Sequence, residues 1–170
     1  MVEIKKLLIL RHAKAQPDAP VGDRLRALTD RGRRDATTIG EHLRVLVEVP
    51  DAFVTSDARR AMQTAELAAA ACGFEKPLTI EPAIYGAEAA ELADIVRRLA
   101  DAAACVVIVG HNPGLQDLVD SLSGGDLMID HLPTAGLAYL EHDATRWRGL
   151  ADGTCRFRGM TSPRLLAAET

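Results

Sequence analysis

The stretch LLILRHAKAQ, residues 7–16, runs four aliphatic residues straight into two cations and an imidazole. A continuous apolar run of this length is expected of a β-strand that is covered on both faces, as in a parallel sheet. A strand of this kind needs no charge at its end. Arg11, His12 and Lys14 therefore raise the question of whether this strand end is simply solvated or forms a functional site.

Composition limits the classes of protein to which the chain can belong. The 170 residues are 48% hydrophobic but only 4% aromatic, so we expect a single domain over residues 1–170 with a core of Leu, Val, Ile and Ala. The net charge of −4 gives no general attraction to nucleic acid or to anionic membranes, and neither is expected as a partner. Cys72, Cys105 and Cys155 are odd in number and predict reduced thiols in a cytoplasmic protein. We expect no secretory signal and no membrane-spanning segment, because the apolar runs are too short.

The rest of the chain alternates short apolar runs with segments of helical periodicity. We expect strands at residues 7–10, 52–55, 78–80, 105–109 and 136–141, with less regular strands near Trp147 and over 155–157. We expect helices from an N-cap at Thr29 to Pro50, from Ser56 and Asp57 to Cys72 with Gly73 as the C-terminal cap, over 87–103, and from Asn112, with Pro113 in the first position, to Gly124 and Gly125. This alternation predicts an α/β fold, a three-layer α/β/α sandwich around a mostly parallel sheet.

Cations and imidazoles follow three of these strands at their carboxyl ends. Arg11 and His12 follow the first strand, Arg60 lies shortly after the second, and His111 comes directly after the fourth. In open α/β sheets, ligands bind at this edge. Two of the turns also open helices, whose free N–H groups and partial positive charge attract anions. The sequence therefore predicts an anion site, and phosphate suits it best.

Each of these residues has a simpler interpretation when it is taken alone. His12 or His111 could satisfy a local hydrogen bond, and Arg60 could be an exposed helix residue. Their placement at three strand ends in one phosphate-compatible set favours a site. No histidines or cysteines have the spacing of metal ligands, so neither a metal nor another cofactor is expected.

Three motifs together resemble the histidine phosphatase superfamily, and most closely its small SixA-type members, the phosphohistidine phosphatases. They are LRHAKA at residues 10–15, TSDARRAMQTAE at 55–66 and VGHNPGL at 109–115. RALTDRG at residues 26–32 also resembles the family's element that opens the first helix. The resemblance spans roughly residues 5–140 in the expected order and implies a phosphoglycerate mutase-like fold.

The resemblance implies a role for each matching residue. His12 matches the nucleophilic histidine that becomes phosphorylated, and Arg11 and Arg60 match the arginines that hold the phosphoryl oxygens. His111 matches the second histidine of the pocket, and Asn112 is expected to assist phosphate binding through the turn after the fourth strand.

Two further positions follow from the same alignment of motifs. Arg60 falls on the motif arginine, so its neighbour Arg59 is expected to face solvent. Larger members of the family carry an acidic residue before the fourth strand. Glu81, Glu88 and Glu91 lie in this segment, and we take Glu88 as the candidate general acid.

The expected activity is that of a metal-independent histidine phosphatase, a hydrolase of phosphoric monoesters or phosphoramidates. Neutral imidazole is a good nucleophile near neutral pH, and its attack on phosphorus gives a phosphohistidine intermediate. Little chain lies between Gly73 and His111 to enclose a small ligand, so we expect an open site that acts on phosphohistidine presented by a protein and releases inorganic phosphate. Two alternatives stay open: a small-molecule phosphomonoesterase, and a phosphate- or phosphoprotein-binding module that has lost turnover.

Overall fold

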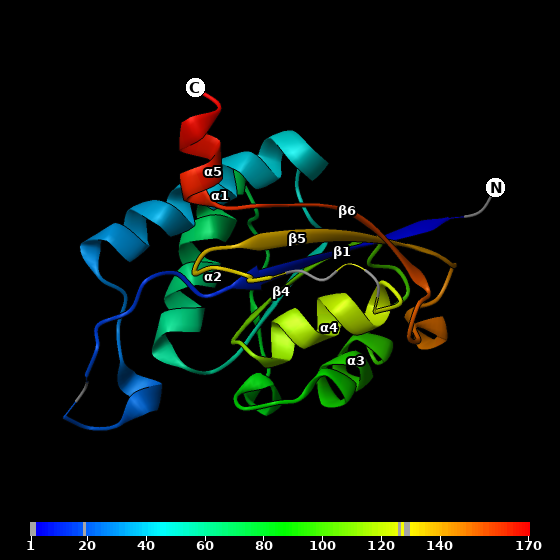
Figure 1. Cartoon of the computed structure of the whole chain (residues 1–170), viewed down its shortest axis with the longest axis horizontal. Helices are drawn as coiled ribbons and strands as arrows, with labels where there is room; N and C mark the ends of the chain where they lie inside the picture. Colours follow the sequence, from blue (N-terminus) through cyan, green and yellow to red (C-terminus); the bar gives the residue numbers. More distant parts are fainter. Residues whose placement is uncertain (1–2, 19, 126, 128–129) are drawn as a thin grey trace.

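A computed structural model describes residues 3–18, 20–125, 127 and 130–170, and its centre is a six-stranded sheet (Figure 1). The strands are β1 (Ile4–Arg11), β2 (Ala52–Thr55), β3 (Thr79–Ile80), β4 (Cys105–Gly110), β5 (Leu137–Asp143) and β6 (Cys155–Thr161). They lie in the order β3-β2-β4-β1-β5-β6. The first four strands are mutually parallel, whereas β5 pairs antiparallel with β1 and β6 pairs antiparallel with β5. The predicted mostly parallel sheet is confirmed.

Helices cover both faces of this sheet and complete three layers (Figure 1). They are α1 (Asp30–Val47), α2 (Arg59–Cys72), α3 (Ala89–Arg97), α4 (Gly114–Leu122) and α5 (Pro163–Ala168), with short 3-10 helices η1 (Asp23–Leu25), η2 (Pro82–Ile84) and η3 (Trp147–Gly149). Because side chains alternate along a strand, β1 serves both layers. Leu8 and Leu10 pack into the core beneath α1 and α2, whereas Leu7 and Ile9 pack into the core beneath α3 and α4. The predicted three-layer sandwich is confirmed.

The expected caps at Thr29 and Gly73 are present, whereas the N-cap position of α2 is Ala58 and not Ser56 or Asp57. The Thr29 hydroxyl accepts a hydrogen bond from the Gly32 N–H, and Gly73 ends α2 in the left-handed conformation with φ 85°. Ser56 accepts from the Ala58 N–H at 3.2 Å, just before α2 begins at Arg59. The Thr29 cap thus marks the start of α1, and Gly73 marks the end of α2.

Gly32 brings the start of α1 unusually close to the turn that follows β1. A Cβ atom at this position would lie 2.1 Å from the Lys14 carbonyl oxygen, so only glycine fits without a backbone shift. The Thr29 N–H donates to the same carbonyl at 2.9 Å. The turn that carries His12 is therefore held in place by α1.

The α3 helix is shorter than expected, because tertiary hydrogen bonds take over the segment that follows it. A helix was predicted over residues 87–103, but α3 ends at Arg97. The carbonyl of Asp101 accepts from buried Lys5 Nζ, and the Asp101 carboxylate accepts from the Trp147 N–H at 2.9 Å. The predicted strand near Trp147 is also wrong. That segment forms η3, with the indole N–H donating to the Ala103 carbonyl at 2.8 Å.

Two further differences concern helix starts. The α4 helix begins at Gly114 rather than with Pro113 in its first position, and a cis peptide bond joins Asn112 to Pro113. The α5 helix was not predicted, although Ser162 caps it and Pro163 opens it, which is a recognisable signal.

Two findings bear on the chain as a whole. Cys72, Cys105 and Cys155 are all free and buried, as the sequence predicted. Among the described residues, no helix combines the length and the apolar character that a membrane crossing requires.

Candidate active site

Two histidines lie side by side at the carboxyl edge of the sheet, because β1 and β4 are neighbours in register. Arg11 pairs with Gly110, so His12 and His111 each follow at the next position of their strands. The His12 N–H donates to the Gly110 carbonyl at 3.0 Å and extends the ladder by one residue. The two imidazole centroids are 5.2 Å apart and the rings are inclined by 54°. The predicted meeting of strand ends therefore occurs.

A backbone contact fixes the tautomer of His12. Its Nδ1 lies 2.8 Å from the Ala13 carbonyl oxygen, which can only accept, so Nδ1 carries the proton and Nε2 carries the lone pair. Burial, together with the charges of Arg60 and Arg11, lowers the pKa of His12 to about 4. The ring is thus neutral near pH 7, with Nε2 free of a proton.

Arg60 is buried beside His12 and is held by a carboxylate from a distant loop. Its Nε donates toward His12 Nε2 at 3.4 Å, its Nη1 donates to the Asp23 carbonyl at 2.8 Å, and its Nη2 lies 3.1 Å from Asp23 Oδ2. Asp23 also accepts hydrogen bonds from the Tyr85 hydroxyl and from Arg26 Nε. These donors, Tyr85 first, hold the pKa of Asp23 well below its usual range, so the carboxylate stays ionised. Sequence reasoning missed Asp23, because no local pattern marks a loop aspartate as the partner of an arginine in a later helix.

Thr64 links the turn after β1 to α2. Its hydroxyl accepts from the Ala13 N–H at 3.0 Å and donates to the Arg60 carbonyl at 2.7 Å. This bridge sets the position of Arg60 relative to His12. Thr64 lies inside the quoted TSDARRAMQTAE motif but was not singled out, since its contact with Ala13 exists only in the folded chain.

Arg11 and Asn112 meet at one carbonyl group. Arg11 Nη1 and Asn112 Nδ2 donate to the Leu132 oxygen at 3.0 and 2.9 Å. Arg11 Nε is buried and has no hydrogen-bond partner among the described residues, and anion binding by Arg11 stays a prediction. Asn112 Nδ2 also lies 3.5 Å from Gln116 Oε1. Asn112 thus ties the β4–α4 turn to Leu132, and phosphate binding by Asn112 stays a prediction.

His111 is held through Ser56 at the end of β2. The His111 Nε2 and Ser56 Oγ atoms are 2.8 Å apart, and Ser56 Oγ already accepts from the Ala58 N–H. The Ser56 hydroxyl hydrogen can therefore be donated to Nε2, which leaves a proton on Nδ1. That Nδ1 is buried without a partner in the described part of the chain. Burial, with the charges of His12 and Arg60 close by, lowers the pKa of His111 to about 3.

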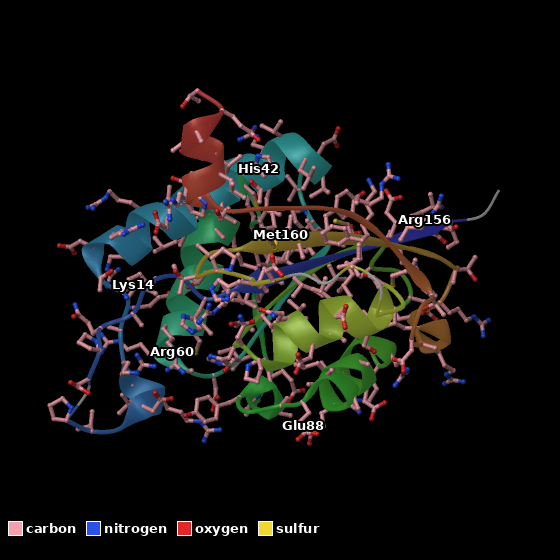
Figure 2. The ribbon with its side chains drawn as sticks, in the orientation of Figure 1. Lys14, His42, Arg60, Glu88, Arg156 and Met160 are labelled. Carbon is pink, nitrogen blue, oxygen red and sulfur yellow. The ribbon has the colours of Figure 1, made fainter. Side chains whose placement is uncertain are left out.

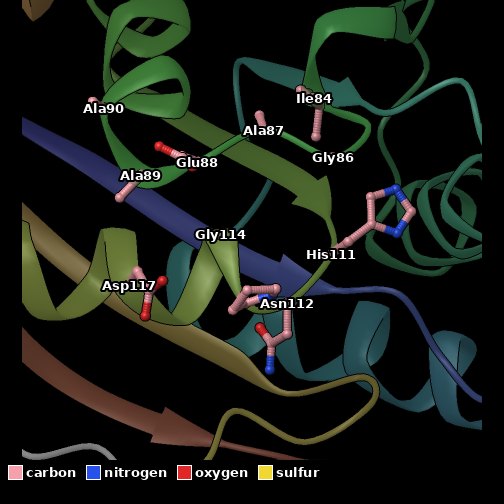
Figure 3. Close-up of a pocket in the computed structure, with 11 residues that line it drawn as sticks. Ile84, Gly86, Ala87, Glu88, Ala89, Ala90, His111, Asn112, Gly114 and Asp117 are labelled. Carbon is pink, nitrogen blue, oxygen red and sulfur yellow. The ribbon is translucent and has the colours of Figure 1, made fainter.

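Glu88 lies apart from the two histidines. Its side chain accepts a backbone N–H in the first turn of α3, in a capping box with Glu91. Figure 2 shows Glu88 at the outer edge of the molecule and Arg60 further inside. In Figure 3 the Glu88 carboxylate points away from the His111 ring. The structure does not bring Glu88 next to His12, and its role as an acid stays a prediction.

A cavity of about 480 Å³ begins at His111. It runs between the η2–α3 segment and the β4–α4 turn (Figure 3) and is lined by Ile84, Gly86, Ala87, Glu88, Ala89, Ala90, His111, Asn112, Pro113, Gly114 and Asp117. Among the described residues, no three histidine, cysteine or carboxylate side chains gather in a way that could hold a metal ion.

The chain belongs to the histidine phosphatase superfamily, whose branch 1 profile matches residues 7–89. Within that superfamily it is of the SixA type. A protein of Nakamurella multipartitia described as a putative phosphohistidine phosphatase SixA superposes with a TM-score of 0.83 at 26% identity, over 94% of this chain and 96% of that one. The protein histidine phosphatase SixA complexed with tungstate superposes with a TM-score of 0.82 at 22% identity, over 95% and 99% of the two chains. An uncharacterised protein of Mycobacterium tuberculosis strain H37Rv is 32% identical over 164 residues, which are 91% of this chain and the whole of that protein. The protein is accordingly a phosphatase.

Proposed function

We propose that this phosphatase hydrolyses phosphohistidine on proteins through a covalent intermediate on His12. The observation that carries the proposal is the state of the His12 ring. Its Nδ1–H is committed to the Ala13 carbonyl, burial keeps the ring neutral, and the Nε2 lone pair faces the guanidinium of Arg60. A neutral imidazole with a fixed lone pair beside a cation is prepared to attack phosphorus.

The two chemical steps use this chain's own residues. In the first step His12 Nε2 forms a bond to phosphorus while the bond from phosphorus to the substrate nitrogen breaks. Arg11, Arg60 and the His111 Nδ1–H hold the three equatorial oxygens, on which charge is spread in a loose transition state. In the second step water attacks phosphorus, the bond to Nε2 breaks, and inorganic phosphate leaves with His12 restored.

The carboxylates near the site favour a substrate that needs little help from an acid. Asp23 is ionised and bound by Arg60, Arg26 and Tyr85, so it has no proton to give. Glu88 is directed to the start of α3. An alkoxide leaving group gains a factor of about 10²–10⁴ from general acid catalysis. A phosphohistidine can instead take up a proton from water on its distal nitrogen and leave as neutral imidazole.

Trapping the intermediate tests the proposal. The enzyme is incubated with labelled phosphoramidate or a labelled phosphohistidine peptide and quenched without acid. We expect one phosphate per chain, on His12, in a bond that survives alkali and is lost in acid. The His12→Ala variant should lose activity by about a thousandfold or more, because groups that act as a unit fail together. Near-normal turnover by His12→Ala would contradict the proposed mechanism. Label that stays on the wild-type protein without turnover would indicate a binding module.

A small-molecule phosphomonoesterase is the second candidate, and the cavity beside His111 favours it. Its volume of about 480 Å³ lies within the range of small-ligand sites. The kcat/KM values for a phosphohistidine peptide, a phosphoserine peptide and several sugar phosphates, measured in one buffer, decide between the two. We expect the phosphohistidine peptide to be preferred. A kcat/KM for a sugar phosphate that is tenfold higher than the value for the phosphohistidine peptide would establish the second candidate instead.

A further inference from the structure

The cavity beside His111 is an open groove because small residues form its walls. We call it the His111 groove, defined by the lining residues given above. Six of its positions are glycine, alanine or proline from 86–90 and 113–114. At its base, a Cβ atom on Gly114 would lie 2.2 Å from the Ala87 carbonyl oxygen, so the two walls meet backbone to backbone there. The groove therefore has space above a closely packed base.

The charge of the surface changes sign along this groove. The groove begins at His111, whose ring lies 5.2 Å from the ring of His12, and Arg60 Nε donates toward His12 Nε2. Arg11 shares the Leu132 carbonyl with Asn112, which also lines the groove. The charged residues that line the groove itself are both acidic, Glu88 and Asp117. Asp117 is exposed, and its carboxylate has no ion-pair or hydrogen-bond partner among the residues that the structure describes. A ligand that lies along the groove thus meets positive charge at its phosphate and negative charge further out.

We propose that the His111 groove receives the polypeptide segment next to the phosphorylated histidine and selects basic or neutral residues over acidic ones. This inference rests on the function proposed above. The groove starts at His111, on one side of the position expected for the phosphoryl group, so it is a direct path for the chain that carries it. Asp117 is the acidic side chain free to interact with charges on that segment, because the Glu88 side chain accepts a backbone N–H at the start of α3. Exposed charges a few ångströms apart change affinity by only about threefold to tenfold.

The test compares two phosphohistidine peptides of equal length that differ only in flanking lysine or glutamate residues, with phosphoramidate as a third substrate without flanks. The kcat/KM values are measured for the wild type, Asp117→Asn and Asp117→Lys at low ionic strength and in 0.5 M salt. The matched control is Glu66→Lys, which makes the same change of charge at an exposed position of α2, on the other face of the sheet. The ratio between the two peptides is the readout, so a general loss of activity in a variant cancels.

We expect the wild type to prefer the lysine peptide by about threefold to tenfold at low salt, with the preference reduced in high salt. The ratio should shrink in Asp117→Asn, fall to one or below in Asp117→Lys, and persist in Glu66→Lys. Equal kcat/KM values for the two peptides in the wild type, or an unchanged ratio in both Asp117 variants, would overturn the groove inference. If phosphoramidate is still hydrolysed in that case, the proposed function remains intact. Absence of turnover on all three substrates would overturn the proposed function and this inference with it.

Discussion

Arg59 and Arg60 are adjacent in the sequence, yet Arg60 is buried at the site and Arg59 is exposed. Arg60 uses three nitrogens at once, toward His12 Nε2, the Asp23 carbonyl and the Asp23 carboxylate. This division of roles depends on the planar fork of the guanidinium, because a lysine ammonium cannot present donors in three fixed directions from one plane.

Replacement of Arg60 by lysine should therefore be severe although the charge is kept. We expect Arg60→Lys to lower kcat/KM by about a hundredfold and to weaken tungstate inhibition by about tenfold, since each lost charge-assisted contact is worth about 1.5–3 kcal/mol. Arg59→Lys is the matched control and should behave as the wild type. Equal effects of the two substitutions would contradict the assignment of Arg60 to the anion site.

The buried histidines should make the free energy of unfolding depend on pH. The pKa of His12 is about 4 in the folded chain and about 6.5 when unfolded, so between these values the unfolded chain binds the extra proton. The contribution of neutral His12 to the free energy of unfolding is complete above pH 6.5 and is lost as the pH falls toward 4. We expect His12 alone to cost about 1–2 kcal/mol between pH 7 and pH 5. Urea unfolding at pH 7, 6 and 5 in phosphate-free buffer should show a smaller decrease for His12→Asn than for the wild type, and parallel curves would contradict the expectation.

At the scale of elements, the site depends on how α1 meets the turn after β1. Gly32 permits this approach, and a methyl group there would collide with the Lys14 carbonyl. We expect Gly32→Ala to lower the free energy of unfolding by about 1–3 kcal/mol, as overpacking does, and to lower kcat because the turn that carries His12 must shift. Gly149→Ala is the control, because its Cβ would make an ordinary contact at 3.6 Å with His142. Denaturant unfolding gives the free energy of unfolding of both variants. Equal values for Gly32→Ala and Gly149→Ala would contradict the close-packing argument.

The elements that local chemistry determines were predictable from the sequence. The β2 strand, the Thr29 cap and the Gly73 cap were predicted because short-range patterns specify them. The far end of α3 and the segment at Trp147 were not predictable, because hydrogen bonds between residues far apart in the chain determine them. Lys5 donates to the Asp101 carbonyl after α3, and the Trp147 indole donates to the Ala103 carbonyl. The same distinction holds in the site. His12, Arg11, Arg60 and His111 follow strand ends or motifs, whereas Asp23 reaches Arg60 only through the fold.

At the scale of the whole molecule, a chain with net charge −4 concentrates cations at one edge of its sheet. In the proposed mechanism, Arg11 and Arg60 supply the charge that phosphoryl transfer needs. We expect chelators to leave activity unchanged, and tungstate or vanadate to compete with substrate, because both resemble a phosphoryl group held by several donors. Steady-state rates with and without EDTA test the first point, and restoration of a lost activity by magnesium or zinc would place the protein in another mechanistic class.

The distance between His12 and His111 is a property of the sheet rather than of any loop. Neighbouring strands lie about 4.8 Å apart, and two residues that leave adjacent strands at the same level inherit that spacing. The 5.2 Å between the ring centroids is close to this spacing. Segments around the rim can therefore be exchanged by grafting, or can diverge during evolution, while the pair of imidazoles keeps its separation. A scaffold of this kind can acquire new substrates through its loops without rebuilding its chemistry.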